Sequence, residues 1–460
     1  MSIEVTNELA EFIKNTKYNQ IPDDVVDAAK ESFLDFLAVS IAGYRKGPLS
    51  KIMIPYLLQI GGKEESTILG VNKKVPSVNA ALANGINAHS MDLDDGHRKA
   101  LGHPGVSVIP AALAVGESIG CNGKVLLTAI MVGYEVFIRI GKAVNPYLFS
   151  RGFHTTGVCG TLAAASATAK VLSLNKEKIV SALGIAGIQC AGLLVVTHSG
   201  QMMKPLNAGK AAQNGVLSAL ISKEGAIGSL KILEGKDGFV QAFSGNCDYA
   251  LILDDLDKNF ELKGCYKKFY PSCRHTHAAI DAALYLKKKE NIIPENIKEI
   301  KVTTYPAALK LTQKEKMPED EAGTRFNLAF AVSLALVKGN AGINEFSAEN
   351  VKDQQISDLF NKVKLISDSS FESKENNVRG AEVEIVSKDN TRLKKRVLLP
   401  KGEPENPATE QELYDKYYSC IGNFWTIDKK EEVWKCIQDL ENIDNIKILM
   451  DLITKCNNFE

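Results

Sequence analysis

Apolar residues recur at helical spacing along most of the first 260 residues. In residues 22–43, Val25, Val26, Ala29 and Phe33 fall on one face of a segment that starts with an acidic turn and ends in glycine. The same pattern predicts further helices over 76–91, 105–119, 123–143, 156–172, 176–192 and 205–223. Many positions in these segments are alanine or glycine, which let helices approach closely. We therefore predict a compact bundle whose central helices are buried on all sides.

The pattern changes after about residue 265, where short alternating segments appear between helices. Residues 297–305 alternate and are rich in β-branched side chains, and residues 379–400 read as a hairpin that turns at Asp389-Asn390. Helices are predicted over 275–290 and 323–338, followed by a polar connector at 401–410.

This change of pattern predicts the fold class and its domains. We expect a mainly α protein with an α+β second domain: a large helical domain over 1–264 and a smaller α/β lid domain over 265–404. The C-terminal helices over 405–460 are expected to return to the helical domain.

Composition limits which partners and which cellular compartment we expect for this protein. Lysine plus arginine (55) equals aspartate plus glutamate (55), so the basic excess typical of nucleic-acid binding is missing and no nucleic-acid partner is expected. No apolar run is long enough to span a membrane, and the start of the chain shows no secretory signal. The nine cysteines are scattered without a CxxC pair, which favours reduced thiols in a cytoplasmic protein.

Candidate chemistry concentrates in residues 87–105, NAHSMDLDDGHRKALGHPG. This stretch holds three of the seven histidines, His89, His97 and His103, and also the aspartates Asp92, Asp94 and Asp95. Histidine and carboxylate side chains are the groups best suited to proton transfer near neutral pH. The stretch therefore predicts an active-site segment, although the two adjacent aspartates also suit helix capping.

Three other segments place polar side chains at helix starts or at the domain boundary. His154 precedes a small-residue helix, where it is either a site residue or a cap, and Lys204 stands before a proline that suits a first helical turn. Lys204 is either a carboxylate ligand or a solvated lysine. The third segment, residues 270–277, contains Arg274, His275 and His277 at the boundary, where ligand clefts are common. His198 is expected to lie in a loop.

Taken together, these segments resemble the MmgE/PrpD family, which includes 2-methylcitrate dehydratase, cis-aconitate decarboxylase and iminodisuccinate epimerase. The resemblance runs from about residue 5 to the C-terminus. It implies a large helical domain with a smaller α/β lid, assembled as a homodimer. The matching segments are HSMDLDDGHR (89–98), HPG (103–105), GYE (133–135), RGFHTTGVCG (151–160), KPLNAGKAAQNG (204–215) and YPSCRHTHAAIDA (270–282).

The resemblance also assigns roles to single residues. The catalytic residues that it implies are Asp92, His103, His154, Lys204 and His277. The residues expected to bind substrate are His97, Arg98, Arg274, His275 and Lys210, and Arg98 suits a bidentate carboxylate contact. His89, Asp94 and Asp95 move toward structural roles. The chain departs from the family at Gly96, where cis-aconitate decarboxylases have threonine, and at Leu328, which replaces a tyrosine.

The predicted function is a lyase without cofactor or metal, 2-methylcitrate dehydratase-like and a hydro-lyase by resemblance, that moves a proton next to a carboxylate of a small di- or tricarboxylate. One alternative is an isomerase or epimerase of a small dicarboxylate, and another is a cis-aconitate decarboxylase-like carboxy-lyase. A metal-dependent hydrolase, with Asp92, Asp94, Asp95, His97 and His103 as ligands, is a further alternative. A binding protein without turnover is the last class.

Overall fold

The computed structural model describes residues 4–197, 201–373 and 378–454, so His198 lies outside the described residues. The chain folds into two compact units. The first contains the chain up to Ser90, Asp94–Cys265 and the chain from Cys420 onward, and the second contains Met91–Leu93 and Tyr266–Ser419.

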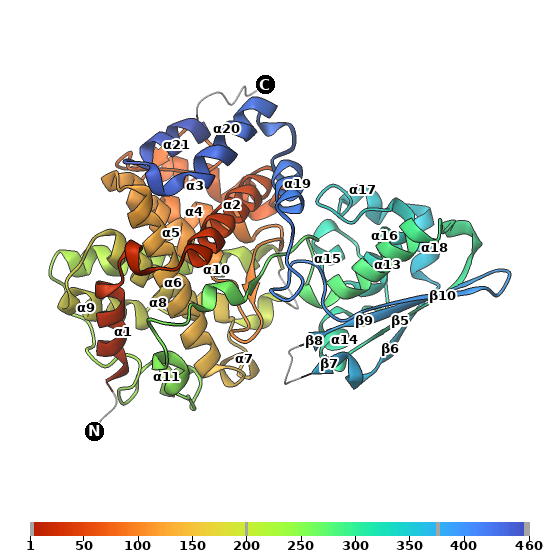
Figure 1. The fold of residues 1–460 in the computed structure, drawn as a ribbon, viewed down its shortest axis with the longest axis horizontal. Coiled ribbons are helices and arrows are strands. Elements are labelled where there is room, and N and C mark those ends of the chain that lie inside the picture. The colour runs from red at the N-terminus through yellow and green to blue at the C-terminus, as the bar shows by residue number, and fades with distance from the viewer. Residues whose placement is uncertain (1–3, 198–200, 374–377, 455–460) are drawn as a thin grey trace. The chain divides into compact units, whose positions relative to one another are not determined.

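The first unit is almost wholly helical, as the sequence predicts (Figure 1). It also contains a short antiparallel pair, β1 (Ser66–Thr67) with β2 (Lys74–Val75), and the strand β3 (Gly96–His97). Its helices are α1 (Val5–Asn15), α2 (Asp23–Lys46), α3 (Pro48–Ile60), α4 (Ser77–His89), α5 (Gly105–Ile119), α6 (Gly123–Val144), α7 (Tyr147–Ser150), α8 (Thr155–Val171), α9 (Lys176–Gly187), α10 (Lys204–Lys223), α11 (Phe239–Phe243), α12 (Ala250–Leu253), α20 (Ile427–Gln438) and α21 (Lys447–Thr454).

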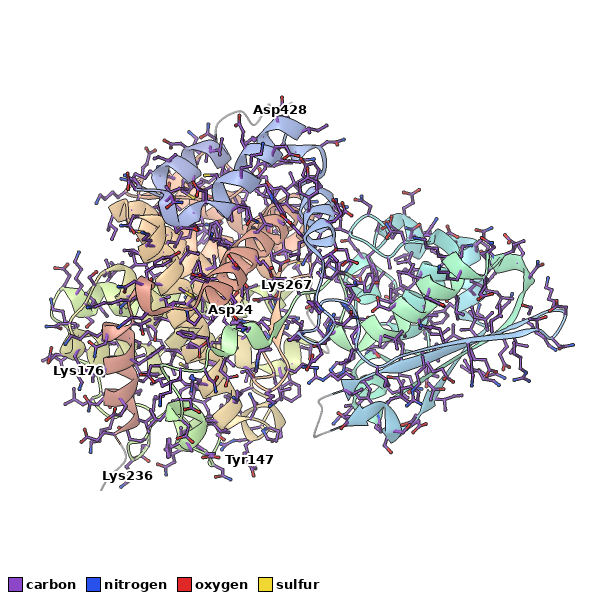
Figure 2. All side chains as sticks on the ribbon, in the orientation of Figure 1. Asp24, Tyr147, Lys176, Lys236, Lys267 and Asp428 are labelled. Atoms are coloured by element: carbon purple, nitrogen blue, oxygen red, sulfur yellow. The ribbon has the colours of Figure 1, made fainter. Side chains whose placement is uncertain are left out.

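Helix α8 lies at the centre of this unit and packs against α5, α6 and α10. All of its residues except Lys170 are buried, which confirms the prediction of a central helix buried on all sides. Glycines make the close helix contacts possible: a Cβ atom on Gly85 of α4 would lie 2.9 Å from the Cα atom of Gly209 on α10. Charged side chains such as Asp24, Lys236 and Asp428 are exposed on the surface of the same unit (Figure 2).

The C-terminal helices belong to the first unit through specific polar contacts. The Lys30 ammonium on α2 donates to the Gln438 carbonyl oxygen at 2.8 Å and pairs with Glu441 at 2.6 Å. Arg45 donates to the Ile421 carbonyl oxygen at 2.7 Å. Hydrogen bonds between the two ends of the chain therefore close this unit.

The second unit combines a four-stranded mixed sheet with helices. The strand order is β10 (Arg392–Val397), β9 (Ala381–Ser387), β5 (Ile297–Thr304) and β6 (Val363–Ser367), with only the β5–β6 pair parallel. A separate antiparallel pair joins β7 (Glu372–Ser373) to β8 (Val378–Arg379), and β4 (Cys265–Tyr266) spans the boundary between the units. The helices are α13 (His277–Lys289), α14 (Pro306–Thr312), α15 (Glu321–Thr324), α16 (Leu328–Lys338), α17 (Ala348–Val351), α18 (Gln354–Phe360) and α19 (Glu410–Ile421), which ends just past Ser419.

The two faces of this sheet differ in polarity. Inward residues such as Ile300, Val383 and Ile385 are fully buried in one core with α13 and α16, which lie on one face of the sheet (Figure 1). On the other face, Lys301 pairs with Glu384 across neighbouring strands at 3.4 Å. The alternation of strand residues thus produces one apolar face and one charged face.

Most predicted elements are confirmed, and two differ for local reasons. The predicted helix 323–338 is two helices, because the Asn327 side chain accepts the Phe330 N–H and caps a new start at Leu328. Helix α9 ends at Gly187 rather than at residue 192, and the Gln189 carbonyl oxygen accepts from the Asn214 amide instead of from a helical N–H.

The two units differ from the predicted domains in two stretches and at Cys265, which groups with the first unit. Residues 405–419 group with the second unit rather than with the helical one, and so do Met91–Leu93. The Lys416 ammonium on α19 donates to the Leu93 carbonyl oxygen at 2.9 Å, which ties both stretches to that unit. That the second unit acts as a lid stays a prediction. Among the described residues, no helix is both long and apolar enough to cross a membrane.

Candidate active site

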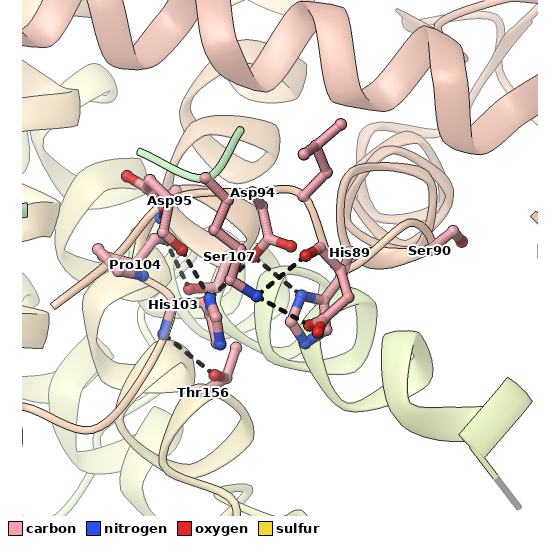
Figure 3. Close-up of polar contacts among 12 residues, drawn as sticks. His89, Ser90, Asp94, Asp95, His103, Pro104, Ser107 and Thr156 are labelled. Carbon is pink, nitrogen blue, oxygen red and sulfur yellow. Dashed lines mark hydrogen bonds and ion pairs between the residues drawn. The ribbon is translucent and has the colours of Figure 1, made fainter. Parts of the chain in front are cut away.

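A buried cluster forms in the first unit where α4 ends and α5 begins. His89 is the last residue of α4, Asp94 lies in the following loop, and His103 precedes α5 by two residues. The Asp94 Oδ2 atom lies 2.9 Å from His89 Nδ1 and 3.1 Å from His103 Nδ1 (Figure 3). The side chains of His89, Asp94 and His103 are 0%, 3% and 14% exposed, so His103 is the member that solvent reaches most.

Asp95, the next residue, anchors the start of α5. Its Oδ1 atom accepts the Gly105 N–H at 3.1 Å, and its Oδ2 atom accepts the Tyr134 hydroxyl of α6 at 2.6 Å. Burial raises the pKa of Asp95 to about 7. The Asp95 carbonyl oxygen also accepts from His103 Nδ1 at 2.6 Å, so this residue positions both the helix and the histidine.

Two further site residues lie at the starts of neighbouring helices. His154 is the N-cap of α8, and Lys204 is the first residue of α10. The Asn207 amide, in the first turn of α10, donates to His154 Nδ1 at 3.1 Å, and the His103 N–H donates to the Thr156 hydroxyl of α8 at 3.2 Å. The first turns of α5, α8 and α10 therefore converge in the first unit.

The electrostatics of this cluster set the charge states of its members. Burial lowers the pKa of His89 to about 4, and the nearby Lys204 charge adds to this effect, so the ring is neutral at pH 7. Burial would raise the pKa of Asp94, but His89 and His103 hold it well below its usual range. The cluster thus contains one buried carboxylate between two imidazole rings.

In the second unit, Asp92 pairs with a lysine that the sequence analysis did not single out. The Lys268 ammonium lies 3.1 Å from Asp92 Oδ1 and donates to the Asp92 carbonyl oxygen at 3.0 Å. Both side chains are buried, and Asp92 has a left-handed backbone with φ of 52°. Aspartate tolerates this conformation better than most residues do. Lys268 stands two residues before the Tyr270-Pro-Ser-Cys motif, and that proximity was the one available signal.

His277, also in the second unit, has hydrogen bonds at both ring nitrogens. Arg274 Nη1 donates to His277 Nδ1 at 2.9 Å, and His277 Nε2 lies 3.3 Å from the Ser272 carbonyl oxygen, to which it donates. Arg274 itself pairs with the buried Glu403 at 2.8 Å. Burial, with the charges of Arg274 and Lys268, lowers the pKa of His277 well below its usual range. The catalytic role of His277 stays a prediction.

The predicted substrate-binding residues have diverse surroundings. His275 Nδ1 contacts the Tyr305 hydroxyl, and burial lowers the pKa of His275 to about 3. His97 Nδ1 accepts the Ala100 N–H at 3.1 Å, and Arg98 is buried in the first unit. Lys210 is exposed on α10 and donates to Gln213 at 2.7 Å. Their roles at substrate stay predictions, as does that of Arg274.

Among the described residues, His89, Asp94 and His103 offer three ligand-type atoms within 4.8 Å of one another. The two N···O distances in this group are hydrogen-bond distances, and each Nδ1 must carry a proton to donate to a carboxylate. Metal binding requires bare nitrogens. Asp95 and His97, two of the ligands in the hydrolase alternative, have the separate partners described above. In this hydrogen-bonded state the two nitrogens bind no metal, and the metal-dependent alternative stays a prediction.

The structure places the two residues at which the resemblance implies a departure from the family. Gly96 lies in β3 and is buried. Leu328 is the first residue of α16 and is fully buried in the core that α13, α16 and the sheet share.

The fold and the two polar clusters define an enzyme built from a large helical unit and a smaller α/β unit. The MmgE/PrpD N-terminal domain matches residues 7–252, and the MmgE/PrpD C-terminal domain matches residues 270–442. The chain therefore belongs to the MmgE/PrpD family.

Three relatives with established names cover between 80% and 98% of this chain. Cis-aconitate decarboxylase of Mus musculus is 27% identical over 98% of this chain and 93% of its own length. The same-named enzyme of Aspergillus terreus is 26% identical over 98% and 96%. The 2-methylcitrate dehydratase of Escherichia coli is 20% identical over 80% and 79%. Decarboxylases and dehydratases are lyases, so the prediction of a lyase of this family agrees with these relatives.

Proposed function

We propose that the protein is a lyase that acts on a small di- or tricarboxylate by moving a proton at the carbon next to a carboxylate, with no cofactor. The observation that carries this proposal is the group of His103, His154 and Lys204 at the first turns of α5, α8 and α10. The names of the relatives support the carboxylate class of substrate.

Carboxylate binding is supported by the charge of this group. Helix N-termini carry partial positive charge and exposed N–H donors, and three of them converge here. Lys204, 8% exposed, adds a full positive charge at the first residue of α10. A carbon next to a carboxylate is a weak acid, so the charge that develops on the carboxylate must be stabilised in the transition state. Lys204 is suited to this role.

The proton-transfer roles follow from the hydrogen bonds of the two histidines. His103 donates through Nδ1, so its Nε2 has the lone pair of a general base. His154 accepts at Nδ1 from Asn207, so the neutral ring has its proton on Nε2 and is suited to donate a hydrogen bond to a leaving oxygen. In the proposed reaction, His103 takes the proton from carbon and the C–H electron pair forms a C=C bond. The C–O bond breaks with its electron pair on oxygen, and the hydroxyl group, which accepts a hydrogen bond from His154 Nε2, takes the proton from the His103 imidazolium and leaves as water. Asp92 and His277 are proposed catalytic residues of the second unit.

An isomerase or epimerase of a small dicarboxylate is the second candidate. The opposite protonation of His103 Nε2 and His154 Nε2 favours it, because one ring is ready to remove a proton and the other to return one. In that reaction no leaving group departs and the substrate formula is unchanged.

We also propose that the protein is a homodimer. Exposed apolar side chains gather along α10 and the segments that follow α9 and α10: Ile188, Leu193, Leu217, Ile221, Ile227 and Leu230. The Gln189 amide donates to the Ser218 hydroxyl at 2.9 Å, so the end of α9 and the exposed side of α10 are neighbours. Contiguous exposed apolar surface of this kind is typical of interfaces between subunits. Light scattering of Leu217→Lys should give half the wild-type mass, whereas an unchanged mass would contradict this interface.

A cytoplasmic location is proposed from the cysteines. The described cysteines are free thiols, and several, including Cys121 and Cys159, are buried. Scattered, unpaired cysteines are typical of reducing compartments. Labelling with a thiol reagent after unfolding, in lysate prepared under acid quench, would show every thiol reduced, and an oxidised pair would contradict this location.

The reaction is tested by incubating the purified protein with a panel of tricarboxylates and of hydroxy- and amino-dicarboxylates in deuterated water, with products read by mass spectrometry. Loss of water supports the proposed hydro-lyase, and loss of carbon dioxide identifies a carboxy-lyase. Deuterium in recovered substrate without a change in formula supports the isomerase. Equilibrium binding of carboxylates with no turnover of any of them would overturn the proposal.

A further inference from the structure

The Asp94 carboxylate has an arrangement that neither proposed chemistry has used. It lies between two imidazole rings that come from different elements, the end of α4 and the loop before α5. One oxygen, Oδ2, takes both contacts, to His89 Nδ1 at 2.9 Å and to His103 Nδ1 at 3.1 Å (Figure 3). An ionised carboxylate is only an acceptor, so both Nδ1 atoms must carry hydrogen.

The proton on His103 Nδ1 is fixed by a second acceptor as well. The Asp95 carbonyl oxygen lies 2.6 Å from the same nitrogen. With Nδ1 held as a donor by two acceptors, the lone pair of the neutral ring is confined to Nε2. The negative charge of Asp94 also stabilises the imidazolium that forms when Nε2 takes a proton.

We propose that Asp94 is the positioning residue of the base His103, fixing its Nε2 as the basic nitrogen, and that His89 holds Asp94 in place from the opposite side. This inference rests on the proton-transfer function proposed above. Asp94 and His89 act through His103 and have no direct role at substrate.

The neutrality of His89 suits this role. A charged ring would neutralise Asp94 and remove its support for the His103 imidazolium, whereas a neutral ring supplies one N–H donor and leaves the charge in place. Burial keeps His89 neutral, because its pKa is lowered to about 4. The nearby Lys204 charge, which disfavours a second positive charge, acts in the same direction.

Two buried atoms of the cluster argue against a purely structural role. His89 Nε2 and Asp94 Oδ1 are buried without a hydrogen-bond partner among the described residues. A buried polar atom without a hydrogen-bond partner destabilises the folded state, and buried groups in a structural network normally all have partners. The cluster keeps these two unpartnered atoms and also keeps the Nδ1 contacts of both rings. This is expected if the tautomers of the two rings are needed for function at the expense of folding stability.

His154 completes the arrangement with the opposite tautomer. Its ring stacks on that of His89, with centroids 5.9 Å apart and planes 22° from parallel, while the His103 centroid lies 5.0 Å from His89. His103 presents a lone pair at Nε2, and the neutral His154 presents an N–H. His89 therefore lies between an acceptor ring and a donor ring, and it contacts both.

The test is nitrogen NMR of the full chain with ¹⁵N-labelled histidine, in which His103→Asn and His89→Asn assign the signals. The wild type should show His103 as the Nδ1–H tautomer. In Asp94→Asn the anionic acceptor is lost and the new amide N–H group competes with the Asp95 carbonyl oxygen for Nδ1, so a fraction of His103 should change to the Nε2–H tautomer. Turnover should then fall by about a hundredfold to ten-thousandfold with little change in KM.

Two substitutions of His89 distinguish its hydrogen bond to Asp94 from its packing in the core. His89→Asn retains a donor near the Nδ1 position and should keep the wild-type tautomer of His103 and turnover within about threefold of wild type. His89→Leu fills the space but removes the donor, and should lower turnover by about tenfold or more. If the two variants have equal turnover and equal His103 signals, His89 has no positioning role.

Glu117→Gln is the matched control for Asp94→Asn. Glu117 is a buried carboxylate that accepts from Thr67 and pairs with Lys74, near the far end of α5, about 18 Å along the helix from the site. Its substitution should leave the His103 signals and turnover per folded molecule unchanged.

Three results would overturn the inference or separate it from the proposed function. An Nε2–H tautomer of His103 in the wild type overturns it, and so does wild-type turnover in folded Asp94→Asn. If the wild type shows the Nδ1–H tautomer but turns over no carboxylate, the proposed function fails while the positioning by Asp94 stands. Should Asp94→Asn not fold, the wild-type spectrum and the His89 pair still decide.

Discussion

At the scale of residues, two lysines on one helix differ in burial and in contacts because of their positions along it. Lys204 and Lys210 both lie in the segment KPLNAGKAAQNG of α10. Lys204 is the first residue of the helix, 8% exposed, and its charge reaches the buried ring of His89. Lys210 is exposed, and its ammonium donates a hydrogen bond to the Gln213 side chain one turn further along the same helix. The lysine at the helix start is therefore the stronger candidate for a carboxylate ligand.

The first prediction concerns this lysine. Lys204→Ala should lower kcat/KM for the identified carboxylate by at least about a hundredfold, because the charge that develops on the substrate loses its nearest cation. Steady-state kinetics measures the effect. Lys223→Ala, at the exposed end of the same helix, is the control and should keep wild-type kinetics. Wild-type kinetics in Lys204→Ala would remove Lys204 from the site.

The second prediction concerns pH and Asp95. Its folded-state pKa of about 7 lies above the ordinary value of 3.8, so the folded protein holds a proton that the unfolded chain releases. This residue therefore costs stability as pH rises from about 4 to 7, by up to about 4 kcal/mol. Asp95→Asn should gain unfolding free energy relative to wild type across that window, measured by urea unfolding.

A comparison with Asp94 checks the direction of the predicted pH dependence of stability. The pKa of Asp94 is held well below its usual range, so its charge stabilises the folded state at neutral pH. As pH rises to about 4, Asp94→Asn should lose stability relative to wild type, and the difference should stay constant from pH 4 to 7, where Asp95→Asn gains stability. Parallel curves for the two variants would contradict both pKa directions.

At the scale of elements, the site depends on how closely α10 packs against α4. A Cβ atom on Gly209 would lie 2.5 Å from the backbone carbonyl oxygen of Leu82, which cannot move without distorting α4. Lys204 and Asn207 lie within the two turns before Gly209, and His89 ends α4. The glycine thus sets the separation of the two helices that present these side chains.

The third prediction follows from this contact. Gly209→Ala should lower the free energy of unfolding by about 1–3 kcal/mol, because the added methyl group must push two backbones apart. Activity should fall with it, since Asn207 would shift relative to His154. Thermal unfolding and kinetics measure the two effects. Lys223→Ala is again the control, and equal or higher stability of Gly209→Ala would show that the helices can separate freely.

Elements were predictable where local patterns decide them. Helix α5 matches its predicted range of 105–119, and the strand and hairpin of the sheet match as well, because apolar spacing and turn residues are local. The split before Leu328 was missed because the Asn327 cap competes with a continuous apolar pattern. Strand β6 was missed because its pairing with β5, far away in sequence, fixes it.

The site was only partly predictable for a related reason. The motifs indicated His103, His154 and Lys204, since each stands beside a glycine, a proline or a helix start. They did not indicate Asn207 or Lys268, whose roles rest on partners far away in sequence. Burial, which decides the charge state of His89, also cannot be obtained from a single motif.

At the scale of the whole molecule, the chain changes unit within a few residues. His89 and Asp94 belong to the first unit, while Met91–Leu93 between them belong to the second. Lys268 and Lys416 hold this short segment through the carbonyl oxygens of Asp92 and Leu93, at 3.0 and 2.9 Å. Buried lysines thus fix a segment that immediately precedes Asp94 and Asp95.

The fourth prediction tests this hold. Lys268→Met should lower the stability of the folded chain by about 3–5 kcal/mol, because the buried Asp92 carboxylate loses its ion pair. Lys263→Gln removes an exposed pair with Asp24 and should change nothing measurable. Urea unfolding compares the two. An equal loss of unfolding free energy in both variants would show that the buried Asp92–Lys268 pair stabilises the fold no more than an exposed pair does.

The three-residue passage through the second unit constrains how this protein can be recombined with its relatives. A chimera that exchanged only residues 266–419 would bring Lys268 and Lys416 from one parent and their acceptors at 91–93 from the other. Two of these acceptors are backbone carbonyl oxygens, which any sequence supplies. The third is the Asp92 carboxylate, which is present only if the parent has an aspartate at this position. Crossover points for functional chimeras should therefore be paired, with residues 91–93 inherited together with the second unit.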